Sequence, residues 1–189
     1  MSLSAEQLLP IVQKYWRADK VYHFSSETSP ENERRGVLWE EELKKIERWW
    51  AFLDELKREL PGFTIGDATA TCDVCFRCAA YSPTNRQKPP LRWAVVGCVS
   101  ILAPVYTVYG AQSEHGASGR IDRAVFEPLP PEMRVPADVI ARRIEATFGV
   151  SALAREVAET PVPLIVEPQE PPDTTLFHAL FTSQPESIP

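Results

Sequence analysis

The strongest hydrophobic pattern in the chain lies in residues 37–60. Apolar side chains recur there at steps of three and four residues, at Trp39, Leu43, Ile46, Trp50, Leu53 and Leu56. This spacing puts them on one side of an α-helix, which ends at Pro61-Gly62. The pattern predicts a long amphipathic helix that buries Trp50 in the core and leaves Trp49 at the margin of the buried side.

Between residues 63 and 127 the hydrophobic period falls to about two, as in half-buried β-strands. Turn-forming residues separate the alternating segments, at Ser82-Pro83, Pro89-Pro90, Ala103-Pro104 and SEHGASG. A second, shorter helix is expected over residues 139–148, opened by Pro136 and ended by Gly149. We therefore expect an α+β fold, with both helices packed on one face of an antiparallel sheet of four to five strands.

The pattern is weaker at both ends of the chain. Short elements are expected at residues 5–17 (a helix with Ser4 as N-cap and Pro10 as a kink), 151–158 (a helix), 164–166 (an edge strand) and 175–181 (a helical turn capped by Asp173). Seven of the 18 prolines lie in the last 29 residues. This bias predicts that residues 167–189 form an irregular, Pro-rich tail that runs extended over the surface.

Length and composition agree with one globular domain spanning residues 1–189. Hydrophobic residues make up 44% and charged residues 24% of the chain, which excludes a disordered or fibrous protein. The net charge of −6 argues against a nucleic-acid partner and favours a basic protein as partner. No signal peptide is readable, so we expect a cytoplasmic protein, as a monomer or homodimer.

One uncharged stretch, residues 93–113, is long enough to cross a bilayer. It contains Gly97, Pro104 and Gly110 and is rich in Val, Tyr and Thr, which favours two buried strands instead of a membrane helix. We therefore expect no contact with membranes.

Four cysteines form the most conspicuous local motif, C-x-x-C-x-x-C at Cys72, Cys75 and Cys78 with Cys98 downstream. Thiolates at this spacing could bind zinc or an iron–sulfur cluster. In a strand, however, Cys75 would point away from Cys72 and Cys78. We therefore expect buried thiols, with no metal and no cofactor. A disulfide from Cys98 to Cys72 or Cys78 is geometrically possible but improbable in a reducing cytoplasm.

No catalytic motif is readable: the chain lacks a nucleophile elbow, a P-loop, a dinucleotide-binding fingerprint and an H-E-x-x-H helix. Its histidines, His23, His115 and His178, lie in separate regions. An alternative remains open, namely an enzyme or small-molecule-binding domain whose pocket lies between helices and sheet. Such a pocket would use His115, Glu114 or Arg77.

Acidic residues suggest a recognition surface, because Glu40 and Glu41 would lie with Asp73 if the long helix packs against the first strand. An acidic α+β chain with a Trp-rich helix, LWEEELKKIERWWAFLDELKRELPGF, and a strand meander resembles the immunity proteins of bacterial polymorphic toxin systems, over residues 37–127. The resemblance implies a non-enzymatic antitoxin that occludes the active site of a cognate toxin domain.

We expect the charged side chains in such an inhibitor to steer association with the partner and aromatic side chains to anchor it. The candidate partner-binding residues are Glu40, Glu41, Asp73, Arg77, Tyr81, Tyr22 and Phe24.

Overall fold

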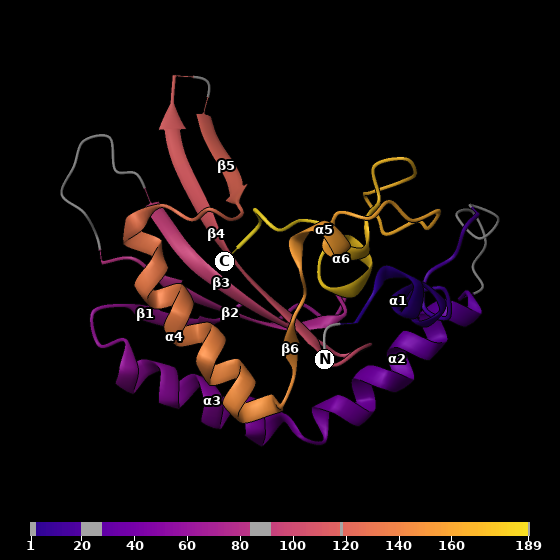
Figure 1. Ribbon diagram of the computed structural model, residues 1–189, viewed down its shortest axis with the longest axis horizontal. Helices are drawn as coiled ribbons and strands as arrows, with labels where there is room; N and C mark the ends of the chain where they lie inside the picture. Colours follow the sequence, from indigo (N-terminus) through magenta and orange to yellow (C-terminus); the bar gives the residue numbers. More distant parts are fainter. Residues whose placement is uncertain (1–2, 20–27, 84–91, 118, 189) are drawn as a thin grey trace.

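The computed structural model describes residues 3–19, 28–83, 92–117 and 119–188 (Figure 1). The elements in chain order are α1 (Ala5–Val12), α2 (Pro30–Leu43), α3 (Ile46–Glu59), β1 (Thr64–Asp67), β2 (Cys75–Tyr81), β3 (Arg92–Ser100), β4 (Val105–Gly116), β5 (Gly119–Val125), α4 (Pro131–Phe148), β6 (Ser151–Ala152), α5 (Arg155–Ala158) and α6 (Leu176–Leu180). The fold is α+β, as the periodicity predicts.

The sheet is an open meander in the order β1-β2-β3-β4-β5, with every neighbouring pair antiparallel. This confirms the predicted antiparallel meander. One further strand makes the sheet mixed, because β6 pairs parallel with the start of β4, Val105 opposite Ser151. Residues 93–113 accordingly lie in β3, in β4 and in the turn between them. No helix in the described ranges is long and apolar enough to cross a membrane.

Both faces of the central strands are buried. On one face lies what we call the α3–α4 core, which includes Trp49, Phe52, Phe76, Val95 and Ile140. This is the predicted arrangement of two helices on one face of the sheet.

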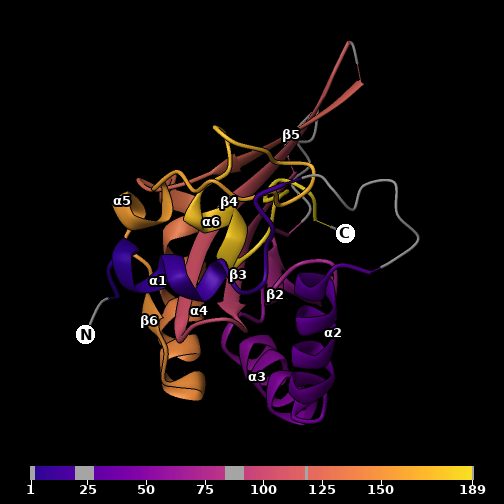
Figure 2. The ribbon, with the colours of Figure 1, turned by 90° about the vertical axis from the view of Figure 1, so that its right-hand side faces the viewer.

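The opposite face of the sheet is covered by what we call the C-terminal core. It includes Leu8 and Val12 of α1, Val96 of β3 and Leu180 and Phe181 at the end of α6. Helices α1 and α6 lie beside each other over this face (Figure 2). The sequence pattern predicted no cover for this side.

Two glycines let α4 lie close to the sheet. A Cβ atom at Gly97 of β3 would sit 2.6 Å from Ile140 Cγ2, and one at Gly110 of β4 would collide with the sulfur of Met133. Real Cβ atoms do not approach neighbours so closely, so larger residues at these positions would push α4 outward. The close approach buries Met133, Ile140 and Ile144 completely.

The predicted long helix is interrupted. Helix α2 ends at Leu43, and Lys44 and Lys45 form a turn before α3 begins, so the two helices meet at an angle along the lower border of Figure 1. The bend allows Trp39 of α2 to pack edge-on against Phe76, with ring centroids 5.2 Å apart. Its indole N–H donates to the backbone carbonyl of Asp73 at 2.9 Å.

The buried side of α3 contains Leu53 and Leu56, as predicted, but it includes Trp49 and Phe52 in place of Trp50. Trp49 is 1% exposed and Trp50 is 53% exposed. Trp49 lies among aromatic rings, with centroids 5.0 Å from Phe52, 5.2 Å from Phe76 and 5.9 Å from Phe148. The prediction that Trp50 belongs to the core is therefore wrong, because the break before α3 sets the phase of that helix independently of α2.

Several predicted boundaries shift. The capping box at Ser4 and the left-handed Gly149 at the end of α4, with φ of 67°, are as expected. Helix α4 begins earlier, however, at Pro131, so Pro136 lies inside it. Residues 164–166 are buried but form no named strand. The helical turn near residue 176 is present, and its N-cap is Thr175 instead of Asp173.

The Pro-rich segment from residue 167 does not run extended throughout, because it contains α6. Leu176, Leu180 and Phe181 are completely buried in the C-terminal core. Trp16 donates its indole N–H to the carbonyl of Ala179 at 2.8 Å, and Tyr109 donates its hydroxyl to the carbonyl of Pro185 at 2.9 Å. This segment is therefore part of the folded core.

The two tryptophans of α3 should differ in their effect on stability. We expect Trp49→Ala to lower the free energy of unfolding by about 3–5 kcal/mol, because it empties a closely packed aromatic site. We expect Trp50→Ala to cost about 1 kcal/mol or less, because that side chain is largely in solvent. Urea denaturation of both variants measures this difference, and a larger loss for Trp50→Ala would contradict the assignment.

A chain that ends after Gln184 should be less stable than the full chain. It lacks the carbonyl of Pro185, so the buried Tyr109 hydroxyl loses its acceptor, at a cost of about 1–3 kcal/mol. It also lacks Ile188, which packs against the C-terminal core. Thermal unfolding followed by circular dichroism tests this expectation, and equal melting temperatures would show that the last residues are dispensable.

Candidate functional site

The predicted partner-binding residues that the structure describes lie on α2, on β2 and in the turn before β2. Glu40 and Glu41 are exposed on α2, as expected of recognition residues. Tyr81 is half-buried at the end of β2. Two further candidates, Tyr22 and Phe24, lie outside the described residues.

Arg77 is buried, and Asp73 is half-buried in the wall of a cavity described below. Arg77 is 6% exposed, and its Nε donates to the carbonyl of Ala68 at 2.9 Å. Its Nη2 lies 3.9 Å from the carboxylate of Asp73, while its Nη1 is buried with no hydrogen-bond partner. The alternation of β2 places Arg77 on the face expected to be polar, but α1 and the C-terminal segment cover that face.

Asp73 anchors the C-terminal segment. Burial raises the pKa of Asp73, whereas the charge of Arg77 and hydrogen bonds from the Thr182 side chain and the Ser183 backbone lower it in part. The backbone N–H of Val74 also donates to the carbonyl of Phe181 at 3.2 Å. The Asp73–Arg77 pair therefore holds the docked C-terminal segment, and its place in partner binding stays a prediction.

The predicted alternation holds for Cys75 and Cys78, which lie on opposite faces of β2, but the expectation of a buried thiol is wrong for Cys72, because the strand begins only at Cys75. Cys75 and Cys98 point into the C-terminal core, Cys78 contacts the α3–α4 core, and Cys72 is exposed before β2. Burial raises the pKa of Cys78 to about 12 and that of Cys75 well above its ordinary value, so both remain thiols. In the described part of the chain no group of three or more His, Cys, Asp or Glu residues could hold a metal ion.

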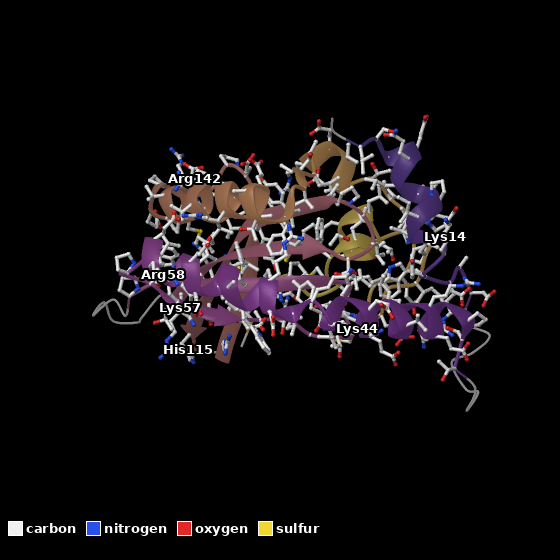
Figure 3. The ribbon with its side chains drawn as sticks, turned by 90° about the horizontal axis from the view of Figure 1, so that it is seen from below. Lys14, Lys44, Lys57, Arg58, His115 and Arg142 are labelled. Carbon is white, nitrogen blue, oxygen red and sulfur yellow. The ribbon has the colours of Figure 1, made fainter. Side chains whose placement is uncertain are left out.

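The residues predicted to form a catalytic pocket lie apart. Glu114 and His115 are exposed on the β4–β5 hairpin, from which Figure 3 labels His115. His115 lines a cavity of about 220 Å³ beside Tyr81 and Arg120, but the buried Arg77 is not part of its wall. Arg77 lies in register with Cys98 and Thr107, and His115 is farther along β4, so Arg77 and His115 do not line one cavity.

A cavity of about 570 Å³ with many polar groups lies between α2, the segment after α1 that contains Trp16 and Arg17, residues 71–73 and residues 165–183. Its charged groups largely neutralise one another, since Arg17 pairs with Glu167 at 3.4 Å. The guanidinium of Arg35 lies 4.0 Å from the centre of the Trp16 ring, and burial lowers the pKa of Arg35 to about 10. These contacts tie α2 to α1 and to the C-terminal segment.

The outer side of α2 and α3 combines exposed apolar and acidic side chains. Glu40 and Leu43 are exposed one turn apart on α2, and Glu47 and Trp50 are exposed one turn apart on α3. We call these four residues, which lie on both sides of the turn at Lys44 and Lys45, the α2–α3 stripe. Figure 3 views these two helices from below, with Lys44 beside their junction. Sequence reasoning missed this stripe because it placed Leu43 and Trp50 in the core.

Glu40 and Glu47 of the stripe differ from the neighbouring acids Glu41 and Glu42, which form ion pairs with lysines. Lys44 bonds Glu41 at 2.5 Å, and Lys45 bonds Glu42 at 3.1 Å. Among the described residues, neither Glu40 nor Glu47 has an ion-pair partner. The two unpaired carboxylates therefore remain free to meet positive charges from outside, on either side of Leu43.

Arg77→Met should destabilise the protein in a pH-dependent way. The substitution removes the charge that lowers the pKa of Asp73, so this pKa rises further above its unfolded value. At neutral pH the carboxylate of Asp73 then lacks its cationic partner, which lowers the free energy of unfolding by about 3–5 kcal/mol. This loss of stability becomes smaller as the pH drops to about 3.5, because Asp73 is then protonated in the folded state.

Urea denaturation of the variant and the parent protein at both pH values measures this effect. Arg123→Met, which makes the same change at an exposed position of β5, serves as the control. A loss for Arg77→Met that does not depend on pH would contradict the pairing of Arg77 with Asp73.

Comparison with known proteins adds no further constraint on function. No family model matches the chain, and neither do any curated proteins or solved structures. The function must therefore be inferred from the residues and the geometry of this chain.

Proposed function

We propose that this protein is a non-enzymatic inhibitor that binds a basic partner protein through the α2–α3 stripe. In this proposal it is a cytoplasmic immunity protein, and the partner is a bacterial toxin domain whose active site it occludes. The observation that carries the proposal is the exposure of Trp50, a large aromatic side chain, beside unpaired carboxylates.

The exposure of Trp50 has no explanation in the packing of the fold. Trp49 already fills the aromatic site of α3, so the core does not need a second indole there. Leu43, one of the few other large apolar side chains that are exposed, belongs to the same stripe. Leu43 and Trp50 stand on the two helices that meet at Lys44 and Lys45. Exposed apolar side chains close to one another favour a protein contact, and tryptophan is enriched among the residues that dominate binding energy.

Charge favours a basic partner. The chain carries a net charge of −6, and Glu40 and Glu47 offer unpaired carboxylates next to the apolar side chains. Solvent-exposed charges of this kind speed the encounter with an oppositely charged surface more than they hold the complex together. Helices α2 and α3, which carry these residues, run along the border of the molecule (Figure 1).

Binding should depend on Trp50. We expect the protein to co-purify with the product of the adjacent gene and to rescue cells from its toxicity. Trp50→Ala should weaken the complex by about 30-fold or more, as expected for an anchor residue. Isothermal titration calorimetry measures the affinity.

Val135→Ala is the matched control, because Val135 is 68% exposed on α4 and lies outside the stripe. It should bind as the parent protein does. Unchanged affinity of Trp50→Ala, with a partner bound, would refute the role of the stripe. Failure to bind or neutralise any neighbouring gene product would refute the immunity function.

Glu40 and Glu47 should act mainly on the association rate. We expect Glu40→Lys and Glu47→Lys to slow association, and the effect to shrink as salt rises from about 0.1 M to about 1 M, because the Debye length falls from about 10 Å to about 3 Å. Glu132→Lys makes the same charge change at an exposed position of α4. If all three variants slow association equally, net charge alone steers the partner.

A further inference from the structure

A second cavity, of about 540 Å³, lies where α4, α5 and α6 meet the edge of the sheet. Its wall is mainly apolar and includes Val108 of β4, Phe126, Leu153 and Phe177. Cavities of this size with an apolar wall and a few polar groups are typical of small-molecule sites. This cavity is separate from the α2–α3 stripe, and core side chains do not fill it.

The strand pairing explains why space remains at this edge. The outer edge of β4 pairs with β6 up to Tyr106 and with β5 from Gly110 onward, so no described strand covers it at Thr107 and Val108. The opposing walls carry the small side chains of Ala141, Ala154 and Ala158. The gap in the ladder and these alanines together leave the cavity open.

His178 lies between this cavity and the 570 Å³ cavity and contributes to the walls of both. Its Nδ1 lies 3.1 Å from the backbone N of Thr175 and accepts that N–H, so the proton of the neutral imidazole is on Nε2. Burial lowers the pKa of His178, which keeps the ring neutral at pH 7. Among the described residues, no group accepts a hydrogen bond from Nε2.

The charged groups of this cavity do not favour an ionic ligand. Arg155 is bound to Glu159 at 2.5 Å, and its guanidinium lies 4.5 Å from the centre of the Phe126 ring. It is therefore already neutralised, while Glu127 and Glu159 would repel an anion. What remains is a mainly apolar space whose neutral polar side chains include His178, Thr107 and Thr175.

We propose that this cavity binds a small, neutral, apolar molecule with a hydrogen-bond acceptor, such as a ketone or an ester, whose oxygen accepts from His178 Nε2. This binding activity is independent of the proposed inhibition, because none of the residues of the α2–α3 stripe lines the cavity. A bound ligand would contact α5 and α6 and so stabilise the C-terminal core.

The neutral fluorescent ketone prodan is a suitable probe. Its emission shifts to shorter wavelength in an apolar site and responds to a hydrogen bond at its carbonyl. We expect saturable binding to the full chain and a rise in its melting temperature. Absence of saturable binding would overturn the proposal, and tighter binding of an anionic naphthalene sulfonate than of prodan would overturn the assigned ligand class.

Filling the cavity locates the binding site. Ala154→Phe and Ala141→Phe narrow it from opposite walls and should abolish most of the fluorescence change. Ala51→Phe adds the same ring at an exposed position of α3 and should bind as the parent protein does. Circular dichroism confirms that each variant is folded, and undiminished binding by a folded Ala154→Phe or Ala141→Phe protein would place the probe elsewhere.

His178→Asn isolates the donor. The asparagine oxygen can replace Nδ1 as acceptor for the Thr175 N–H, while the Nε2 donor is lost. We expect affinity for prodan to fall about fivefold, the equivalent of one ordinary hydrogen bond, and its emission to move to shorter wavelength. Unchanged affinity and emission would show that His178 does not contact the ligand.

Discussion

The fold depends on a sheet that is apolar on both faces. Strands β2 and β3 and the start of β4 alternate between two buried sides, so each side needs its own cover. Helices α3 and α4 cover one side, and Gly97 and Gly110 let α4 approach closely enough to exclude water. The other side can be covered only by segments from the two ends of the chain, α1 and the residues around α6.

The packing of α1 and the C-terminal segment on the second face of the sheet explains why Arg77 is buried. Because the C-terminal segment packs over β2, the side chain of Arg77 is enclosed, and it remains charged beside Asp73. The carboxylate of Asp73 in turn holds the C-terminal segment, because it accepts hydrogen bonds from the Thr182 side chain and the Ser183 backbone. Removing one partner of a buried ion pair lowers the free energy of unfolding far more than the intact pair raises it. Arg77 and Asp73 are therefore structural residues of the core.

The same packing decides which surfaces remain for function. Trp39 is the one residue of α2 that is fully buried, and Trp49 begins the buried side of α3. The outer sides of both helices therefore keep apolar side chains in solvent, and we infer a protein partner from them. At the opposite end, β5 and β6 leave a gap along β4, and the cavity there suits a small neutral molecule.

The sequence by itself determined the features that follow from local periodicity. The meander, the alternation of the cysteines in β2 and the stop of α4 at Gly149 could be predicted, because strand period, helix period and glycine conformation depend on neighbouring residues. The sequence did not determine which of Trp49 and Trp50 is buried, because adjacent indoles have the same hydrophobicity. The break at Lys44 and Lys45 sets the rotational phase of α3 and so decides between them. The docking of α6, the burial of Arg77 and the cavity beside β4 were decided only by tertiary contacts between segments far apart in the chain.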